Sequence, residues 1–568
     1  MNKKLESKIR EWLEPPFDKS THLAISKLRE NSEILEDAFY KNLEFGTGGM
    51  RGIMGVGTNR INQYTLGKCT QGLSDYLKKK FKGEIKTVIA YDCRKNSKSL
   101  ARKVAEVFSA NGIKVFLYSD LRSTPQLSFT VRHLKAKCGI VLTASHNPPE
   151  YNGYKVYWED GGQIVPPQDK EIIRQIENTK FDKILSEPNE SLIEIIGDGL
   201  DKAFINTSLK LGLLEIDLRS NFKIVFTSLH GTSITAVPQV LKNAGYNNVN
   251  IVSAQAKPDG NFPTVKSPNP EEPEALNLAI DEAEKLNADI VIGTDPDSDR
   301  LGVAVRDLDN KFYLLNGNQT MAVMTYYLLE NWKKKKNLNG KQFIASTIVS
   351  SPMIKRIALS YGVKYMETLT GFKWIGKLIK DNPSLDFIGG GEESFGYLVG
   401  SEIRDKDAIT STLLACEIGA HSKQIGKSFY NILETCYRKY GAYKERLISF
   451  NQTGKKGAKK INEMMNSFRY NSPKKIGSKK IIQIDDYLIR KRFKPLPNLK
   501  VNIDLPKANV IIYKLEDDSR IAIRPSGTEP KIKFYFSVNV KMGENESWKE
   551  VEQKLDIKIN KLIETLKL

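Results

Sequence analysis

The run Cys138-Gly-Ile-Val-Leu142 leads directly into Thr143-Ala-Ser-His-Asn-Pro-Pro-Glu-Tyr-Asn-Gly-Tyr-Lys155. A short, continuous apolar run is typical of a strand buried on both faces of a parallel sheet. Ligands of open α/β sheets bind beyond the carboxyl ends of such strands, so Ser145 is a candidate for chemistry. The alternative is a surface turn with a solvated serine, because Asn147-Pro148 and Asn152-Gly153 are turn dipeptides.

The same order of elements recurs three times along the chain. In each unit, three short apolar segments are separated by helix-compatible stretches such as 99–111, and the third segment runs into a polar loop. This order is typical of βαβαβ units in mixed, largely parallel sheets. The predicted strands are 87–91, 113–118 and 138–142, then 222–226, 248–252 and 288–292, and finally 341–345, 363–366 and 386–389.

The carboxyl-terminal part has a different pattern. Its segments 510–513, 520–524 and 532–536 alternate in polarity, which favours antiparallel pairing, and 546–566 is an amphipathic helix. We therefore expect three related α/β domains and a C-terminal α+β domain around a central cleft. Their predicted ranges are 1–205, 206–322, 323–445 and 446–568.

The composition, with 40% hydrophobic and 27% charged residues among 568, is that of a globular protein. Five cysteines are scattered without CxxC spacing, which favours reduced thiols. The amino terminus has no apolar signal segment, and no stretch approaches the roughly 18 apolar residues of a membrane span. The expectation is a cytoplasmic protein without a membrane partner.

The net charge of +20 raises nucleic-acid binding as an alternative function. The excess lies in lysine runs, 333–336, 455–460 and 474–480, rather than in an arginine-aromatic stripe. We expect solvated lysines that attract anionic substrates, and no nucleic-acid partner. A steep salt dependence of DNA or RNA binding would instead support the alternative.

Asp295-Pro-Asp-Ser-Asp-Arg300 places three carboxylates at alternate positions after the second unit's third strand. Packed carboxylates repel one another unless a cation neutralises them, and oxygen ligands suit Mg²⁺. An EF-hand is excluded, because it requires glycine and glutamate where this chain has Arg300 and Arg306. Three acidic ligands leave positions around a Mg²⁺ ion for water and a phosphate oxygen.

Two further loops have the composition of ligand sites. Gly389-Gly-Gly-Glu-Glu-Ser-Phe-Gly396 combines a flexible backbone with groups that hydrogen-bond sugar hydroxyls. Arg524-Pro-Ser-Gly-Thr-Glu-Pro-Lys531 offers a guanidinium, two hydroxyls and backbone N–H groups, the components of a phosphate cradle. Each has a plain turn as its alternative. The match of 371–377 to GxxxxGK predicts no ATP site, because Leu378 replaces the Ser or Thr that would hold Mg²⁺.

Four segments resemble, in order, the signature loops of the α-D-phosphohexomutases. They are 143–148 with 152–155, then 293–300, 391–396 and 524–528. The resemblance spans nearly the whole chain. Phe45-Gly-Thr-Gly-Gly-Met-Arg-Gly52 looks like the branch that contains bacterial phosphoglucomutases and mammalian-type phosphopentomutases.

The resemblance implies a mutase that interconverts glucose 1-phosphate and glucose 6-phosphate. Ser145 would carry a phosphoryl group, and Mg²⁺ would bridge it to Asp295, Asp297 and Asp299. The phosphoserine would give its group to the free hydroxyl of the substrate. The resulting glucose 1,6-bisphosphate, also the activator, would turn around and return its other phosphate to Ser145.

Further roles follow from the same resemblance. Lys155 matches the family's catalytic lysine, whereas His146 is a secondary candidate because adjacent side chains are expected to point apart. Arg51 and Arg300 resemble arginines near the phosphoserine. The implied substrate-binding residues are Arg300, Thr370, Gly371, Lys373, Glu392, Ser394, Arg404, Lys406, Arg524, Ser526, Gly527 and Thr528.

The substrate has alternatives within the same chemistry. The branch includes enzymes for ribose or deoxyribose phosphates, and mannose phosphates are a further alternative. No loop indicates the ring size. We expect a monomer or dimer whose partner is a small phosphosugar.

Overall fold

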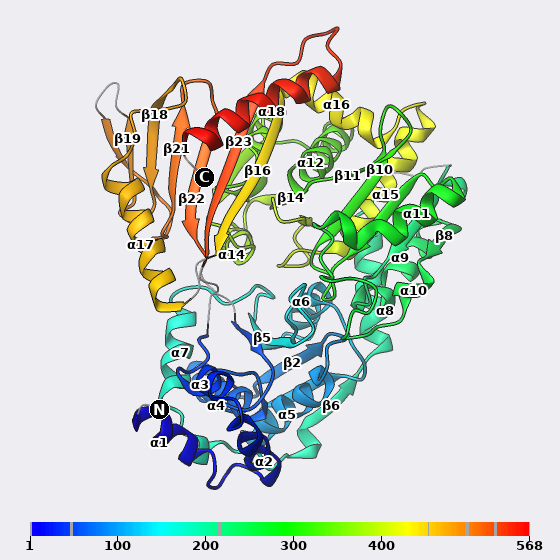
Figure 1. Ribbon diagram of the computed structural model, residues 1–568. Helices are drawn as coiled ribbons and strands as arrows, with labels where there is room; N and C mark the ends of the chain where they lie inside the picture. The colour runs from blue at the N-terminus through cyan, green and yellow to red at the C-terminus, as the bar shows by residue number, and fades with distance from the viewer. Residues whose placement is uncertain are drawn as a thin grey trace.

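The structure is a computed structural model that describes residues 3–45, 49–212, 218–451, 454–494, 499–526 and 531–566. Four β-sheets follow one another along the chain, and the parts that carry them lie around a common centre (Figure 1). The expected fold class, three α/β units followed by a β-rich C-terminal unit, is confirmed.

The first three sheets share one plan. In the first, β2 (Lys86–Tyr91) lies between β3 (Lys114–Tyr118) and β4 (Cys138–Leu142), and these three strands are parallel. β5 (Tyr151–Trp158) then pairs antiparallel with β4. The second sheet repeats this plan with β7 (Lys223–Thr227), β8 (Asn248–Ile251), β9 (Ile290–Thr294) and antiparallel β10 (Leu301–Arg306), and the third with β12 (Gln342–Thr347), β13 (Lys364–Thr368), β14 (Asp386–Glu392) and antiparallel β15 (Gly396–Val399).

This repetition gives the three polar loops the same place in each unit. Each loop joins the third parallel strand to the antiparallel strand that follows it. The first two sheets carry additional edge strands. These are β1 (Gly49–Ile53) beside β5, β6 (Ile193–Ile196) beside β3, and β11 (Phe312–Leu315) beside β10.

Burial on both faces explains the continuous apolar run of β2. Val88 and Ala90 pack into one core cluster, whereas Ile89 and Tyr91 pack into another. The helices with which these sheets pack are α4 (Gln63–Lys80), α5 (Ser97–Ala110), α6 (Thr124–His133), α7 (Gln168–Asn178), α8 (Asp198–Lys210), α9 (Val237–Asn243), α11 (Asn277–Leu286), α12 (Gly317–Lys334), α13 (Met353–Ser360), α14 (Lys373–Asp381), α15 (Ala408–Gln424) and α16 (Phe429–Tyr440).

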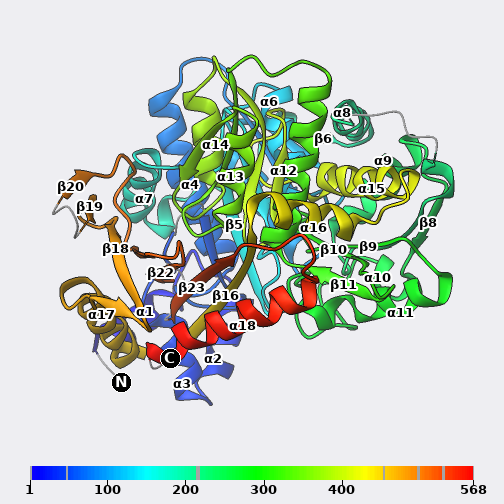
Figure 2. The same cartoon turned by 90° about the horizontal axis from the view of Figure 1, so that it is seen from above.

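The fourth sheet is antiparallel throughout, as the alternating segments predict. α18 (Trp548–Thr565) lies across β16 and β23 (Figure 2), and α17 (Gly454–Tyr470) packs on β22 and β23. The strand order is β16 (Ala442–Asn451), β23 (Lys531–Val540), β22 (Arg520–Pro525), β21 (Ile511–Leu515), β18 (Lys479–Asp486), β19 (Lys491–Lys494) and β20 (Leu499–Asn502), with β17 (Lys475–Ile476) paired to β18.

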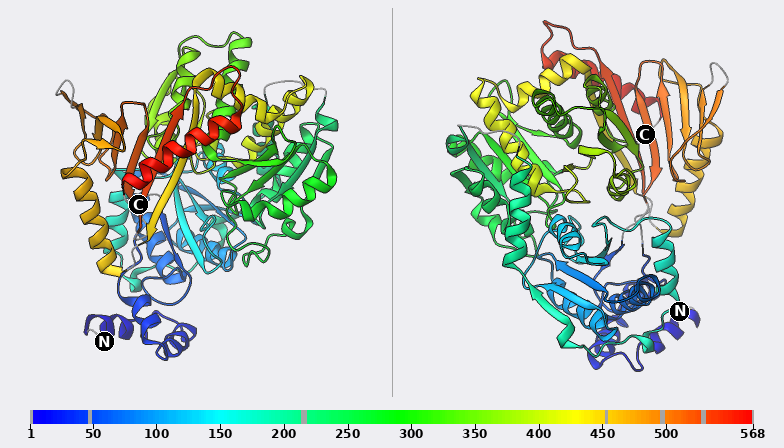
Figure 3. Two further views of the ribbon diagram at one scale, coloured as in Figure 1. Left: turned by 45° about the horizontal axis from the view of Figure 1, so that its top comes forward. Right: turned by 180° about the vertical axis from the view of Figure 1, so that it is seen from behind.

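The distribution of the core shows how the units are joined. One continuous buried cluster runs through the second, third and fourth sheets, whereas the first sheet has separate clusters on its two faces. α8 leads from the first unit to the second, which Figure 3 shows from behind. The helices α1 (Lys3–Glu11), α2 (Lys19–Leu28) and α3 (Ser32–Phe39) form a further aromatic cluster around Trp12. Within the described ranges, no helix combines the length and the apolar character that crossing a membrane requires.

One of the turns predicted between Thr143 and Lys155 is absent from the structure. Asn152 and Gly153 lie inside β5, although this dipeptide is typical of turns. The close approach of two neighbouring backbones explains the glycine, since a Cβ at Gly153 would lie 2.5 Å from the carbonyl oxygen of Thr143 and 2.7 Å from that of Met50. Lys155 therefore lies on a buried strand.

Candidate functional site

Ser145 lies in the loop between β4 and β5 and has a left-handed backbone conformation, with φ of 53°. This conformation is uncommon for a residue other than glycine and occurs frequently at functional sites. The Ser145 N–H donates to Thr143 Oγ1 at 2.8 Å, and its hydroxyl donates to Asp295 Oδ2 at 2.6 Å. Ser145 is only 2% exposed, so the interpretation as a solvated surface serine is wrong.

His146 lies closer to the serine than expected. Its Nδ1 is 3.2 Å from Ser145 Oγ, so the prediction that the two adjacent side chains point apart is wrong. The left-handed backbone at Ser145 turns the chain so that both side chains face the same space. Burial, followed by the guanidinium groups of Arg300 and Arg51, holds the pKa of His146 well below its usual range.

Asp295, Asp297 and Asp299 converge as the sequence predicts. One carboxylate oxygen from each lies within 4.8 Å of the others, and all three side chains are buried. Asp295 Oδ1 accepts the backbone N–H groups of Asp299 and Arg300 at 3.0 and 2.9 Å. The Oδ1 atoms of Asp297 and Asp299 have no hydrogen-bond partner among the described residues. Buried carboxylate oxygens without donors fit a hard divalent cation.

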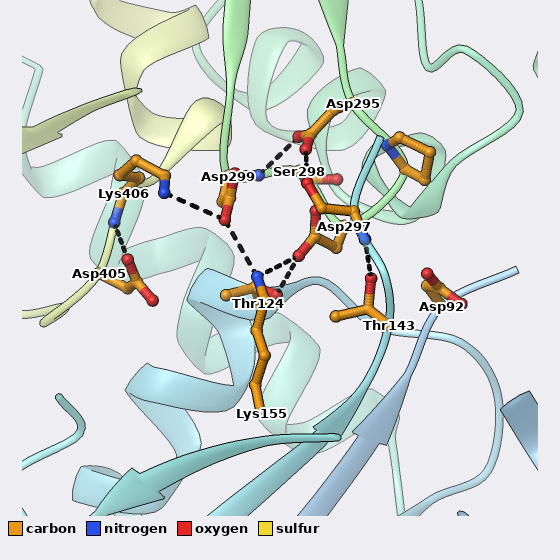
Figure 4. A network of polar contacts seen from close by, with 12 residues as sticks. Asp92, Thr124, Thr143, Lys155, Asp295, Asp297, Ser298, Asp299, Asp405 and Lys406 are labelled. Atoms are coloured by element: carbon orange, nitrogen blue, oxygen red, sulfur yellow. Dashed lines mark hydrogen bonds and ion pairs between the residues drawn. The ribbon is translucent and has the colours of Figure 1, made fainter. Parts of the chain in front are cut away.

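Two lysines approach this acidic group (Figure 4). Lys155 rises from β5 and donates to Asp297 Oδ2 at 2.6 Å and to Asp299 Oδ2 at 3.2 Å. Lys406 Nζ lies 3.4 Å from Asp299 Oδ2. Burial opposes the charge on Lys155, but the two aspartates outweigh it and raise its pKa. Burial likewise opposes ionisation of Asp299, but Lys406 and Lys155 outweigh it and lower the pKa of that carboxyl group.

The two arginines expected near the serine are both at its loop. Arg51, on β1, donates to Asn147 Oδ1 at 2.8 Å. Arg300 pairs with Glu271, which belongs to none of the sequence motifs. This pair and His146 line the same cavity.

A cavity of about 300 Å³ lies between the first and third units. It is bounded by Ser145 and Lys155 on one side and by the loop 370–373 with Glu392 on the other. Glu392 accepts the N–H of Gly371 at 2.8 Å and lies 3.6 Å from Lys406 Nζ. Thr370 Oγ1 and Lys373 Nζ, although buried, have no hydrogen-bond partner among the described residues. Burial lowers the pKa of Lys373. Unpaired polar groups that line a cavity indicate a polar ligand.

A second cavity, of about 650 Å³, shares Arg300 and Thr370 with the first and reaches the fourth sheet. It is lined by Ser394 from the third unit and by Arg524 and Lys533 from the fourth. Arg524 Nη1 donates to the Tyr535 hydroxyl at 3.3 Å. The two cavities together connect Ser145 with the predicted phosphate cradle.

Four predicted positions contribute less directly or fall outside the described residues. Arg404 lies at the seam between the first and third units, where its backbone N–H donates to Ser128 Oγ at 2.9 Å. The backbone N–H of Ser526 donates to the carbonyl oxygen of Lys531 at 2.7 Å. Gly527 and Thr528 lie outside the described residues.

Two buried residues at the centre were not predicted. Thr124, at the amino end of α6, donates from its hydroxyl to Asp297 Oδ2 and from its N–H to the Asp297 carbonyl, both at 2.9 Å. Arg94 holds the Ser145 loop through its backbone carbonyls. The sequence could have indicated both residues as candidates, because each follows the carboxyl end of a predicted parallel strand.

Comparison with family models gives three matches in chain order. The models describe the phosphoglucomutase/phosphomannomutase α/β/α domains I, II and III, and they match residues 42–183, 202–309 and 316–440. Each match contains one of the three loops that join parallel to antiparallel strands.

Individual proteins are similar over nearly the full length. A phosphoglucomutase of Staphylococcus haemolyticus is 39% identical over 509 residues, which cover 89% of this chain and 92% of the relative. The open form of parafusin, a phosphoglucomutase from Paramecium, has a TM-score of 0.67 at 20% identity and covers 92% of this chain and 96% of its own. A phosphoglucomutase/phosphomannomutase family protein from Burkholderia thailandensis has a TM-score of 0.65 at 17% identity, with 92% and 97% covered. At these identities the two solved structures support the fold.

Proposed function

The chain belongs to the phosphoglucomutase/phosphomannomutase family, and we propose that it interconverts glucose 1-phosphate and glucose 6-phosphate through a phosphorylated Ser145. The observation that carries the proposal is the 2.6 Å contact between the Ser145 hydroxyl and Asp295 at the edge of a cavity lined with cationic side chains. The 39% identity to a phosphoglucomutase supports glucose as the sugar.

Ser145 is the group that carries the phosphoryl group between substrates. The phosphoryl group leaves Ser145 Oγ for the free hydroxyl of the bound sugar phosphate, and the product is glucose 1,6-bisphosphate. After this intermediate turns around, its other phosphate returns to Ser145 and the second sugar phosphate leaves. The bisphosphate also serves as the activator that phosphorylates an empty serine.

Each transfer moves a proton from the attacking hydroxyl to the leaving oxygen. Lys155 is the first candidate for this exchange, because its charged amine lies among the carboxylates beside Ser145 and also neutralises them. His146 is the second, because its uncharged ring is within hydrogen-bond range of Ser145 Oγ. Arg51 and Arg300 place positive charge at the same loop.

Asp295, Asp297 and Asp299 are proposed to hold Mg²⁺, because the three carboxylates converge and the Oδ1 atoms of Asp297 and Asp299 have no hydrogen-bond partner among the described residues. When bound, the ion would withdraw negative charge from the transferring phosphoryl group.

The remaining predicted residues are proposed to hold the substrate at a distance from Ser145. Arg524 with Ser526, Gly527 and Thr528 would bind the non-reacting phosphate through charge-assisted hydrogen bonds. The sugar ring is proposed to lie against Thr370, Gly371, Lys373, Glu392, Ser394, Arg404 and Lys406. A clamp that recognises a phosphate and shared hydroxyls accepts both orientations of the bisphosphate.

The unit ranges 1–205, 206–322, 323–445 and 446–568 are proposed as the nucleophile, metal, sugar and phosphate domains. The cytoplasm is the proposed location, supported by the five cysteines, all free thiols within the described ranges.

The decisive experiment compares kcat/KM for glucose 1-phosphate and ribose 1-phosphate with a bisphosphate activator present. A glucose preference of about 10-fold or more is expected, because one additional carbon with its hydroxyl adds contacts in the cavity. A preference for ribose 1-phosphate would assign the chain to pentose phosphates and overturn the glucose proposal. Mannose 1-phosphate is the third substrate of the comparison.

A further inference from the structure

The loop that carries Ser145 folds around one buried arginine. Arg94 follows β2, and its side chain is 0% exposed. Its Nη2 donates to the Ser145 carbonyl oxygen at 2.6 Å and also to that of Asn147, whereas its Nη1 donates to the carbonyl oxygens of Pro148 and Tyr151 at 2.7 and 2.9 Å. One guanidinium group thus binds four carbonyl groups, three in the loop and one on Tyr151, the first residue of β5.

Arg94 is itself fixed by the end of β2. Asp92, also 0% exposed, lies 3.4 Å from Arg94 Nε, and its Oδ1 accepts the Arg94 N–H at 2.9 Å and the Ser97 hydroxyl at 2.8 Å. Figure 4 shows Asp92 at the edge of the acidic group, near Thr143. The guanidinium group therefore has a defined orientation before any ligand binds.

The other face of Arg94 contacts the second unit. The ring centroid of Phe262 lies 5.0 Å from the Arg94 guanidinium carbon, a cation–π distance. The backbones meet here as well, because a Cβ at Gly260 would lie 2.8 Å from Arg94 Cα and 2.6 Å from the Lys95 nitrogen. Phe262 lies between α10 (Ser253–Ala256) and α11, in the unit whose strand β9 leads into the acidic loop of Asp295.

We propose that Arg94 is the positioning residue of the Ser145 loop: it fixes the serine relative to Asp295 by holding four backbone carbonyls and by docking on Phe262. This inference rests on the proposed function, in which Ser145 gains and loses a doubly charged group in every cycle. A loop held only by its ligands would shift as that charge appears and disappears. A cation whose partners are backbone carbonyls holds the loop in both states.

Arginine is required for this role by its shape. Its two terminal nitrogens each bind two carbonyl groups in one plane, whereas a lysine ammonium group offers three donors from a single atom. Arg94→Lys therefore keeps the positive charge but loses some of the hydrogen bonds to the four carbonyl groups. Arg94→Met loses the charge and all of these hydrogen bonds.

Arg60 supplies a matched control. It is also buried, donates to the carbonyl oxygens of Asp37 and Asn59 at 3.3 and 3.0 Å, and pairs with the Asp37 carboxylate at 2.6 Å. It belongs to neither cavity that forms the site. Arg60→Lys and Arg60→Met therefore report the structural cost of losing a buried arginine.

The experiment measures kcat, KM and Tm for all four variants, and hydrogen exchange of peptides that cover 143–151. Arg94→Lys is expected to lower kcat about 100-fold, as a misplacement of about 1 Å can, with KM changed less than about 3-fold. Arg94→Met is expected to lower kcat further. Residues 143–151 should exchange faster in both Arg94 variants, and the Arg60 variants should lower Tm while kcat and this exchange stay as in the wild type.

The inference is overturned if folded Arg94→Lys keeps the wild-type kcat, if exchange of 143–151 does not change, or if the Arg60 variants lose kcat equally. Failure of the proposed function is a separate result, because the wild type would then show no mutase activity. The hydrogen-exchange measurement would still test whether Arg94 holds residues 143–151. If both Arg94 variants fail to fold, Phe262→Leu takes their place. It should lower kcat about 3- to 10-fold and speed exchange of the same peptides.

Discussion

The hydroxyl of Ser145 donates a 2.6 Å hydrogen bond to Oδ2 of Asp295, a residue 150 positions later in the chain. The serine lies in the loop that follows the third parallel strand of the first sheet, and the aspartate follows the corresponding strand of the second. Two structurally equivalent loops therefore meet face to face. The nucleophile and the proposed metal ligands come from different units of one repeated plan.

Ser145→Ala is expected to abolish turnover, because no other hydroxyl replaces a phosphoryl carrier. Intact-protein mass spectrometry should find a phosphate on the wild type and none on the variant. Ser74→Ala, which removes a buried hydroxyl bonded to the Thr70 carbonyl in α4, is the control and should keep both phosphate and activity. Normal turnover by Ser145→Ala would exclude the phosphoserine mechanism.

Chelation of divalent cations should remove activity, and Mg²⁺ should restore it. Added Mg²⁺ should also raise Tm, because a cation that binds only the folded state stabilises it. Asp297→Asn is expected to lose this rise in Tm, since it removes one of the three converging carboxylates. Asp289→Asn, at the surface against Lys423, should keep it. Activity that is indifferent to chelator would contradict the metal role.

Arg524→Met should raise KM about 10- to 100-fold, because a hydrogen bond from a charged group contributes roughly 1.5–3 kcal/mol and 1.4 kcal/mol corresponds to tenfold. The expected change in kcat is smaller, since the residue binds the phosphate that does not react. Arg306→Met, which removes an arginine stacked on Phe312 away from both cavities, is the control. An unchanged KM would place the phosphate elsewhere.

Lys155→Met is expected to lower kcat at least about 100-fold, within the range of general acid–base catalysis. It removes a proton-carrying group and also the cation that neutralises Asp297 and Asp299. His146→Gln should cost less, about 10-fold. If His146→Gln is the more damaging of the two, the order of the candidates is reversed.

Asp407 should make stability depend on pH. Burial raises its pKa from 3.8 to about 6, although hydrogen bonds from Thr410 and Ile409 oppose the shift. Between these values the unfolded chain has lost the proton that the folded protein keeps, so the free energy of unfolding falls as pH rises. The loss, about 3 kcal/mol at 1.36 kcal/mol per pKa unit, is complete above pH 6.

The test follows Tm of the wild type and Asp407→Asn between pH 4 and pH 7. The Tm of Asp407→Asn should rise relative to that of the wild type as pH rises. Asp381→Asn, at an exposed position beside Lys377, should show no such trend. A pH-independent difference for Asp407→Asn would contradict the raised pKa.

Local sequence patterns were sufficient to predict the parallel strands and the family. Continuous apolar runs predict β2, β4 and β9 because both faces of these strands are buried, and each turn into polar residues predicts a ligand loop at the carboxyl end. Three carboxylates at alternate positions predict a cation site, since only a cation relieves their repulsion. The family and the fold class are confirmed, and the roles of the individual residues stay predictions.

The relations between distant segments required the tertiary structure. Local pattern alone assigns Asn152-Gly153 to a turn, but pairing with β1 and β4 makes it part of a strand and buries Lys155 between two aspartates. Adjacent side chains ordinarily diverge, but one left-handed residue turns His146 toward Ser145 Oγ. Arg94 illustrates the same limit. Its four acceptors are backbone carbonyls, which every sequence possesses, so no pattern of side chains reveals which loop folds around it. Local sequence thus establishes which chemical groups are present and at which strand ends they lie, whereas long-range packing brings particular groups into contact.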